Sequence, residues 1–177
     1  MAIEKRKKKF FDVEMPLIGK ETQMQAYEIS ELNGRFMRYD LTRALRGKSI
    51  MLTLRVKVED GKATTVPKKI ELLPFFIRRM IRKGTNYVED SFDAECKDSK
   101  LRIKPLLVTR RKVSRAIRKE LRNKMKEELI AYVKDKESEK LFDEVLKAQM
   151  QKVLSLRLKK IYPLALCEIR VFEAKEK

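Results

Sequence analysis

The most informative absence in this chain of 177 residues is histidine, of which there is none. Histidine is the usual general acid or base near neutral pH and the commonest metal ligand, so Ser-His-Asp triads, Cys-His triads and most transition-metal sites are excluded. The two cysteines, Cys96 and Cys167, are too few for a disulfide scaffold or a four-thiolate zinc site. We expect both to be reduced core residues, and the sequence indicates no cofactor.

Long apolar runs and flexible linkers are also missing. No apolar run approaches the roughly 18 residues of a membrane-spanning helix, and no secretory or lipidation signal opens the chain. We therefore expect a soluble, intracellular protein without a membrane partner. Five Gly and five Pro leave no room for a long flexible linker, and 43% apolar content suffices for one core. A single domain spanning residues 1–177 is the expectation.

Positive charge is what the chain has in excess. There are 44 Lys plus Arg against 26 Asp plus Glu, a formal net charge of +18. Such an excess costs self-repulsion in a compact fold unless an anionic partner neutralises it. A nucleic acid fits this requirement better than a membrane does, because the chain has no segment that could enter a bilayer.

The most basic segment is residues 109–126, TRRKVSRAIRKELRNKMK, in which nine Lys or Arg residues stand against one acid. Its apolar residues recur every fourth position, and its arginines recur every third or fourth position on a different arc. The two sets are Val113, Ile117, Leu121 and Met125, and Arg111, Arg115, Arg118 and Arg122. This spacing predicts a helix with one face that packs and another that can only meet anions.

Two further segments are basic. Residues 1–10 form an arm containing EKRKKK, which we expect to be disordered when unbound and to contact RNA rather than serve only as a solubilising tail. Residues 74–83 predict a short helix, with Pro74 in its first turn and Gly84 just past its end. Its arginines have no acid among them, which favours phosphate contacts over a merely solvated face. The candidate RNA-binding residues are Lys5, Arg6, Lys7, Lys8, Lys9, Arg78, Arg79, Arg82, Arg110, Arg111, Lys112, Arg115, Arg118, Lys119 and Arg122.

Residues 11–109 are predicted to be mainly β. Apolar and polar residues alternate over 49–59, which indicates a half-buried strand, and Asp60-Gly61 supplies a two-residue hairpin turn. The return strand over 62–66 should lie at a sheet edge or stop at Pro67, because proline cannot donate to a ladder. A second hairpin is expected from residues 87–97 and 100–109, with its turn at Asp98-Ser99.

This second hairpin carries the only acids that suggest catalysis. If its turn is at 98–99, the register places Glu95 opposite Arg102 and Asp93 opposite Lys104. Paired carboxylates also bind Mg²⁺ near phosphates, so a magnesium-dependent nuclease using Asp93 and Glu95 is an alternative hypothesis. Cross-strand neutralisation makes the structural role the favoured interpretation, although each exposed pair is weak.

Residues 110–163 are predicted to be helical. The basic helix continues to Val133, a charged turn follows at 135–139, and a second helix over 141–162 ends at Pro163. Residues 164–172 alternate again and predict a closing strand that must pair with the earlier sheet. The expected fold class is therefore α+β, with the sheet in the N-terminal half, helices in the C-terminal half and a final strand that returns to the sheet.

Five segments, in order and at similar spacing, resemble a known family over nearly the whole chain. They are KKKFFDVEMP, GRFMRYDLT, IRRMIRKGTNYVEDSFDAECKD, SRAIRKELRNKM and KKIYPLALCEIRV. The chain is similar in these segments to the archaeal and eukaryotic S3Ae family of small-ribosomal-subunit proteins. It departs from the family at Phe10, where members usually carry Trp. It also lacks the basic C-terminal extension of eukaryotic members, so we expect an archaeal-type member.

The resemblance implies a structural, non-enzymatic constituent of the small ribosomal subunit in the cytoplasm. It implies rRNA binding on the subunit platform near the rRNA 3′ end and the mRNA exit, with neighbouring platform proteins as partners, mRNA nearby and no homo-oligomer. It also implies a β-barrel-like antiparallel half joined to helices. The alternative that rests on charge alone is a free-standing, non-specific RNA-binding protein or RNA chaperone.

Overall fold

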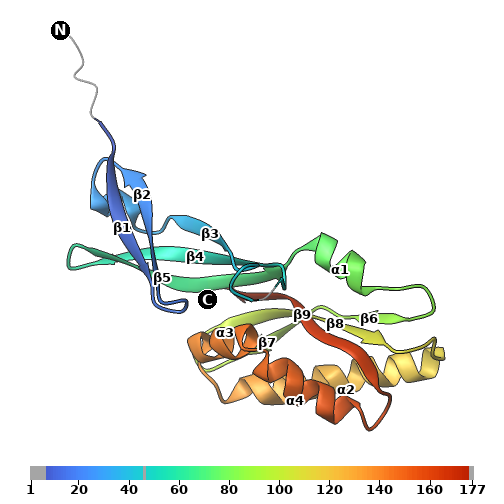
Figure 1. Ribbon diagram of the computed structural model, residues 1–177. Coiled ribbons are helices and arrows are strands. Elements are labelled where there is room, and N and C mark those ends of the chain that lie inside the picture. The colour runs from blue at the N-terminus through green and yellow to red at the C-terminus, as the bar shows by residue number, and fades with distance from the viewer. Residues whose placement is uncertain (1–6, 46, 176–177) are drawn as a thin grey trace. The chain divides into compact units, whose positions relative to one another are not determined.

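The computed structural model describes residues 7–45 and 47–175 (Figure 1). The candidate residues Lys5 and Arg6 lie outside the described residues. The strands are β1 Lys9–Met15, β2 Lys20–Ala26, β3 Phe36–Asp40, β4 Ile50–Glu59, β5 Lys62–Leu72, β6 Tyr87–Glu89, β7 Phe92–Glu95, β8 Lys100–Thr109 and β9 Leu164–Lys175. The helices are α1 Pro74–Met80, α2 Arg115–Lys134, α3 Ser138–Leu146 and α4 Gln149–Leu158, with a 3-10 helix η1 at Ile29–Leu32.

The predicted α+β class is confirmed. Over the described residues the strands form one open sheet with the order β2-β1-β5-β9-β8-β6. Three further strands join this sheet: β4 pairs with β5, β3 pairs with β4, and β7 pairs with β8. The long helices all come from the C-terminal half, and the final strand, β9, joins the sheet as expected. Strands β1 and β5 run parallel, whereas the β1–β2, β5–β9, β6–β8, β7–β8 and β8–β9 pairs are antiparallel.

The chain divides into two compact units, which are described separately. The first comprises the chain up to Tyr39 together with Thr53–Lys68. Its β1–β2 hairpin pairs Lys9 with Ala26 and Met15 with Lys20. Lys9 and Phe10, which the sequence placed in the N-terminal arm, therefore belong to β1. The core of this unit is a small apolar cluster of Val13, Ala26, Leu32, Val56 and Ala63.

The β4–β5 hairpin confirms one turn prediction and corrects one strand prediction. Asp60 and Gly61 both have positive φ, 49° and 76°, as a two-residue turn between twisted strands requires. Strand β5, however, continues past Pro67 to Leu72. It pairs with β1 at Thr64 and with β9 from Lys69, so Pro67 lies between these paired segments, where its missing N–H costs neither of them a hydrogen bond.

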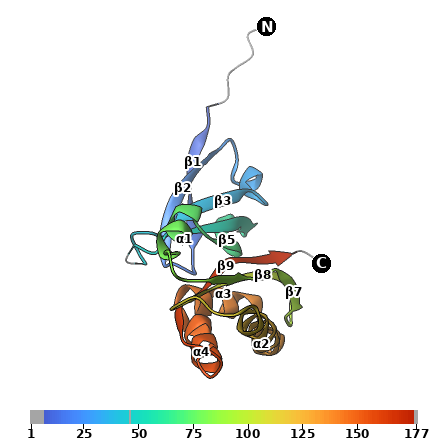
Figure 2. The same ribbon diagram turned by 90° about the vertical axis from the view of Figure 1, so that its right-hand side faces the viewer.

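The second unit comprises Asp40–Leu52 and the chain from Lys69 onward. Its longest antiparallel pair joins β8 to β9, and β6 and β7 both pair with the other edge of β8. Helices α2, α3 and α4 all cover the same face of β8 and β9 (Figure 2). Between these layers the rings of Phe142 and Phe172 meet edge to face, with centroids 5.0 Å apart. The buried stripe of α2 consists of Leu121, Met125, Leu129 and Val133.

The predicted register of the second hairpin is wrong by two residues. Asp93 pairs with Arg102 and Glu95 with Lys100, so the turn lies at 97–98 rather than at 98–99. The cause is Cys96, whose N–H donates to Ser99 O at 3.0 Å and whose thiol also contacts Ser99 O. The predicted single strand over 87–97 is also divided into β6 and β7 at residues 90–91. Both β6 and β7 pair with β8 in the same register, in which residue 90 lies opposite Pro105. The strand is interrupted there because proline has no N–H to donate.

Helix boundaries differ from the prediction at two places. The basic helix begins at Arg115 and not at Thr109, because Thr109 is the last residue of β8 and Ser114 caps α2. The helix expected over 141–162 is divided into α3 and α4. Ala148 adopts φ 57°, which turns the chain so that α4 contacts α2 and β9 as well as α3. No proline or glycine marks this bend in the sequence.

Candidate nucleic-acid interface

The first half of α2 is built to present cations. Ser114 caps the helix, its Oγ accepting a hydrogen bond from the Ile117 N–H at 3.4 Å. The helix is held against the sheet by its buried stripe, which leaves Arg115 and Arg122 exposed and Arg118 partly buried. Serine is a favoured cap because its oxygen satisfies an amide at the open helix end. We call the seven cations of this region the basic face; they are Arg110, Arg111, Lys112, Arg115, Arg118, Lys119 and Arg122.

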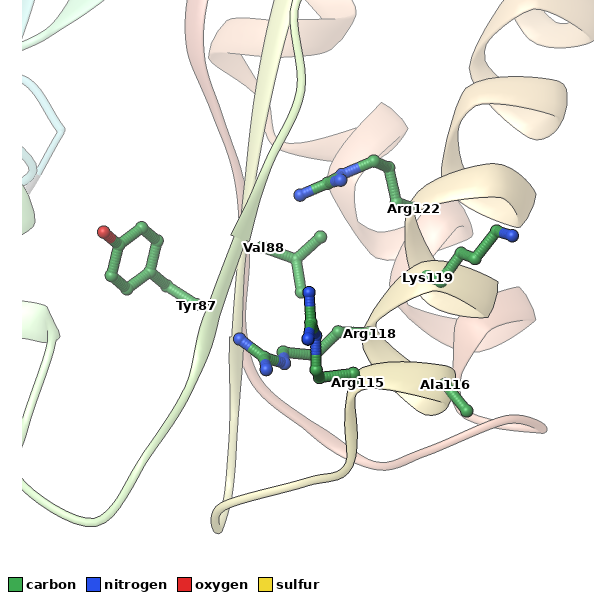
Figure 3. A pocket seen from close by; sticks show the side chains of 7 residues that line it. All are labelled: Tyr87, Val88, Arg115, Ala116, Arg118, Lys119 and Arg122. Carbon is green, nitrogen blue, oxygen red and sulfur yellow. The ribbon is translucent and has the colours of Figure 1, made fainter.

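A cavity of about 450 Å³ lies against this half of α2. It is lined by Tyr87, Val88, Arg115, Ala116, Arg118, Lys119 and Arg122. Figure 3 shows the three guanidinium groups pointing from α2 toward β6, where Val88 faces them. The ring of Tyr87 projects to the other side of that strand. The lining contains four cations and no acid, so the cavity is suited to an anion.

The electrostatics of this helix end are unbalanced. The first turn of α2 contains no acidic residue, although a helix N-terminus already carries partial positive charge. Over residues 7–45 and 47–175, none of the seven cations of the basic face has an ion-pair partner, and the buried Nε of Arg118 has no hydrogen-bond acceptor. Clustered cations at the positive end of a helix oppose folding unless an anion joins them.

The loop before α2 is anchored by Asn86, which the sequence analysis missed. The Asn86 side-chain oxygen accepts from Val113 N–H at 2.8 Å, and the Asn86 N–H donates to the hydroxyl of fully buried Thr109 at 3.0 Å. The Thr109 hydroxyl also lies 2.7 Å from Arg111 O. These bonds hold the loop carrying Arg110–Lys112 beside the segment that precedes β6. A lone Asn before a strand gave no signal of this role.

The arginines of α1 are exposed but do not join the cavity. Arg78 and Arg79 lie on the helix, and the Arg79 guanidinium sits 5.4 Å from the Phe76 ring centroid. Arg82 follows the helix, where its carbonyl accepts from Thr85. In both ribbon views α1 lies on the other side of β8 and β9 from α2 and α4 (Figures 1 and 2). The second basic segment is therefore a separate surface.

The described lysines of the N-terminal segment are exposed in the first unit. Lys7, Lys8 and Lys9 all lie at the surface. Lys8 Nζ is 5.7 Å from the centroid of the Tyr27 ring, a cation–π distance. These three residues remain candidates for RNA contact on their own unit.

The acids proposed for the alternative nuclease site are engaged in ion pairs. Asp93 lies 2.8 Å from Arg102 Nε and 3.0 Å from Lys175 Nζ, and hydrogen bonds from these groups lower the pKa of Asp93 to about 2. Glu95 is 3.2 Å from Lys100. Among the described residues, no group of three or more His, Cys, Asp or Glu side chains is placed to hold a metal ion. The predicted cross-strand neutralisation is therefore present, with partners shifted by the new register.

The cysteines are free thiols, as predicted, but neither is fully buried. Cys96 forms the β7–β8 turn described above. Cys167 is half-buried on β9, where burial raises the pKa of its thiol to about 12. In the part of the chain that the structure describes, no helix is both long and apolar enough to cross a bilayer.

Comparison with known proteins agrees with the resemblance noted in the sequence. The model of the Ribosomal S3Ae family matches residues 4–177. The small ribosomal subunit protein eS1 of Nanoarchaeum equitans is 28% identical over 184 residues, covering 97% of this chain and 92% of that relative. The eS1 protein of Pyrobaculum neutrophilum is 32% identical over 133 residues, covering 74% of this chain and 60% of the relative.

A further eS1 protein, from Methanothermobacter thermautotrophicus, is 33% identical over 113 residues, covering 63% of this chain and 58% of its own length. The matched region thus spans about three fifths of the Pyrobaculum and Methanothermobacter relatives and nearly all of the Nanoarchaeum one. Because the family model covers nearly the whole chain, the protein belongs to the Ribosomal S3Ae family.

Proposed function

We propose that this protein is a structural constituent of the small ribosomal subunit and that it binds rRNA through the basic face. Family membership supports the ribosomal role, and relatives carrying the name small ribosomal subunit protein eS1 support assignment to the small subunit. The finer location follows the family resemblance: the subunit platform, near the rRNA 3′ end and the mRNA exit, beside other platform proteins. This proposal implies a cytoplasmic location and no enzymatic activity.

The observation that carries the proposal is the contrast in ion pairing along α2. The α2 cations Arg115, Arg118, Lys119 and Arg122 have no acidic partner among the described residues. By contrast, Lys124 Nζ lies 3.4 Å from Glu127 and 3.5 Å from Glu128. A solvated helix surface usually mixes both signs. A row of unpaired arginines instead matches the charge of a phosphate backbone.

The chemistry available to the basic face is phosphate recognition. Arginine forks bind phosphate oxygens bidentately, and each neutralised phosphate releases counterions, so affinity falls steeply with salt. The chain contains no Trp and only 7% aromatic residues, which favours recognition of RNA shape and backbone over stacking on exposed bases. The proposed mechanism is therefore electrostatic stabilisation of folded rRNA.

Two further surfaces are assigned to the same partner. Arg78, Arg79 and Arg82 form a second basic surface around α1, and Lys7–Lys9 form a third. Lys5 and Arg6, which lie outside the described residues, are proposed from the sequence to contact RNA as well. Contact at separate surfaces would tie several RNA segments to one protein. This arrangement suits a structural constituent of a ribonucleoprotein.

Sedimentation of extract from the source cells in a low-salt gradient tests the proposal. We expect the protein to comigrate with small subunits in about one copy per subunit and to be released by high salt, because phosphate contacts dominate binding. Recovery only among free soluble species would refute the ribosomal role. Purified protein that binds unrelated duplexes equally well, with no stoichiometric recovery on subunits, would instead support the alternative of a free-standing RNA-binding protein or RNA chaperone.

A further inference from the structure

The cavity beside α2 has more room than a phosphate contact needs. Its volume of about 450 Å³ lies within the range of roughly 300–1,000 Å³ typical of pockets for small organic ligands. A phosphate group alone would fill only a fraction of it, since a water molecule takes about 30 Å³. Cations that merely touch a passing RNA backbone would not require such a depression between a helix and a strand.

The lining has two chemical characters. Arg115, Arg118 and Arg122 direct their guanidinium groups from three turns of α2 toward β6 (Figure 3), without an acid among them. The wall opposite these groups includes Val88, which is 1% exposed. A suitable occupant therefore has a doubly or singly negative group for the guanidinium cluster and a less polar part for the wall.

Arg118 contributes a hydrogen-bond donor that lacks an acceptor. Its side chain is partly buried, and its Nε–H has neither solvent access nor an acceptor among the described residues. A buried donor without an acceptor costs free energy, and this cost is recovered when a ligand supplies the acceptor. Because the Nε–H is closed to solvent, a phosphate oxygen can reach it only when the Arg118 side chain turns toward the cavity. The guanidinium then presents parallel N–H groups to two oxygens.

From these observations we infer that the cavity is a pocket for a single RNA nucleotide that lies outside its helix. Its phosphate would be held by Arg115, Arg118 and Arg122, and its sugar and base would occupy the remaining volume against Val88. This inference rests on the proposed rRNA binding and makes it more specific. A regular duplex presents its phosphates on a convex surface, whereas a bulged nucleotide carries its phosphate and base outward and has already lost its pairing energy.

The test compares RNA hairpins that differ only in one bulged nucleotide in the stem. Fluorescence anisotropy at constant salt would give the affinity of the purified full chain for the perfect stem and for stems bulged with A, C, G, U or an abasic residue. We expect at least one bulged stem to bind about tenfold more tightly than the perfect stem. The abasic bulge should retain only part of this preference, because it keeps the phosphate and loses the base.

Two variants separate the pocket from the rest of the basic face. Arg118→Lys keeps the charge but removes the fork, and Arg122→Gln alters an exposed residue whose change does not threaten folding. Both should reduce the ratio of the affinity for the bulged stem to the affinity for the perfect stem, which we call the bulge preference, toward one. The matched control is Arg110→Gln, an exposed loop residue that does not line the cavity. It should weaken binding to bulged and perfect stems by the same factor and leave the preference intact.

The outcomes distinguish this inference from the proposed function. Equal wild-type affinity for bulged and perfect stems would overturn the nucleotide pocket while leaving rRNA binding in place. A preference that Arg110→Gln abolishes as fully as Arg122→Gln does would also overturn it. Binding of a free nucleoside monophosphate as tightly as the bulged stem would show that the pocket serves a soluble nucleotide and would refute the RNA assignment. Absence of binding to any RNA would refute the proposed function itself.

Discussion

The two halves of α2 have similar exposure and opposite electrostatics. Residues 114–122 carry arginines without partners among the described residues, while residues 124–134 carry cations and acids that pair. Glu128 in the second half also pairs with Arg157 of α4, and Tyr132 donates a hydrogen bond to Glu144 of α3. The second half thus connects the helices to one another, whereas the cations of the first half have no ion-pair partner among the described residues.

This contrast teaches that exposure and composition alone do not identify a binding surface in a chain with net charge +18. What distinguishes a surface held for a partner is the lack of internal partners, since unpaired like charges oppose folding whereas paired ones contribute modestly to it.

The largest effect is expected from removing the unpaired arginines. Arg115→Gln, Arg118→Gln and Arg122→Gln combined should weaken binding to small-subunit rRNA about a hundredfold or more at low salt, and should reduce the salt-dependence slope by about 2–3. Stability should stay within about 0.5 kcal/mol or rise, because repulsion at the helix N-terminus is relieved. Filter binding over a salt series and urea unfolding measure the two quantities.

A triple variant of paired lysines is the matched control for that experiment. Lys124→Gln, Lys136→Gln and Lys147→Gln remove the same net charge from residues that pair with Glu127, Glu144 and Asp143 respectively. We expect this variant to lose stability and to keep most of its RNA affinity. Equal loss of affinity in the two triple variants would show that net charge, and not the unpaired surface, governs binding.

The next effect concerns the loop that leads into the first half of α2. Asn86→Ala leaves the Val113 N–H without its acceptor and should cost about 1–3 kcal/mol of unfolding free energy. RNA affinity should fall as well, because the loop carrying Arg110 and Arg111 loses its anchor. Urea unfolding and anisotropy would measure both effects. Asn123→Ala, at an exposed site on α2, should change stability by no more than about 0.5 kcal/mol.

A smaller effect is expected from the second half of the helix. Glu128→Gln removes the partner of Lys124 and Arg157 and should cost about 1 kcal/mol or less, without weakening RNA binding. The hydrogen bond from Arg157 lowers the pKa of Glu128 below its usual 4.5, so this stabilisation is present above that value and disappears as the pH falls through the folded pKa. Wild type and variant should therefore converge in acid. A difference in unfolding free energy between wild type and variant that persists at the lowest pH would contradict the ion-pair explanation.

The smallest effect extends the comparison to the sheet. The pKa of Asp93 is lowered from 3.8 to about 2 by Arg102 and Lys175, so its contribution is complete above pH 3.8 and is lost as the pH falls toward 2. Asp93→Asn should flatten the acid limb of the stability curve between these values and leave RNA affinity unchanged. Circular dichroism melts across this pH range would show it. A fall in RNA affinity would mean that Asp93 also positions the basic face.

Sequence reasoning succeeded where the relevant forces are local. The alternation over 49–59, the Asp60-Gly61 turn and the returning strand at 164 follow from side-chain alternation and turn stereochemistry, which act within a few residues. The position of the basic helix was predicted from its apolar spacing, apart from its first turn. Ser114 is a strong cap signal, so the start at Arg115 was available in the sequence and was missed.

The errors arose where distant contacts decide. Pro67 is tolerated because β5 pairs with β1 before this residue and with β9 after it. The bend at Ala148 lets α4 contact both α2 and β9. None of these contacts can be deduced from spacing alone, because each depends on which segments meet in the fold.

The sequence by itself determined the class of partner and the residues available for it, because net charge and helical spacing are properties of the chain in any fold. Only the tertiary structure decided which cations remain unpaired, that Arg115, Arg118 and Arg122 face a cavity beside Val88, and that the arginines of α1 lie on a separate surface. The physical reason is that ion pairing and burial are set by distances between segments, and folding alone brings those segments together.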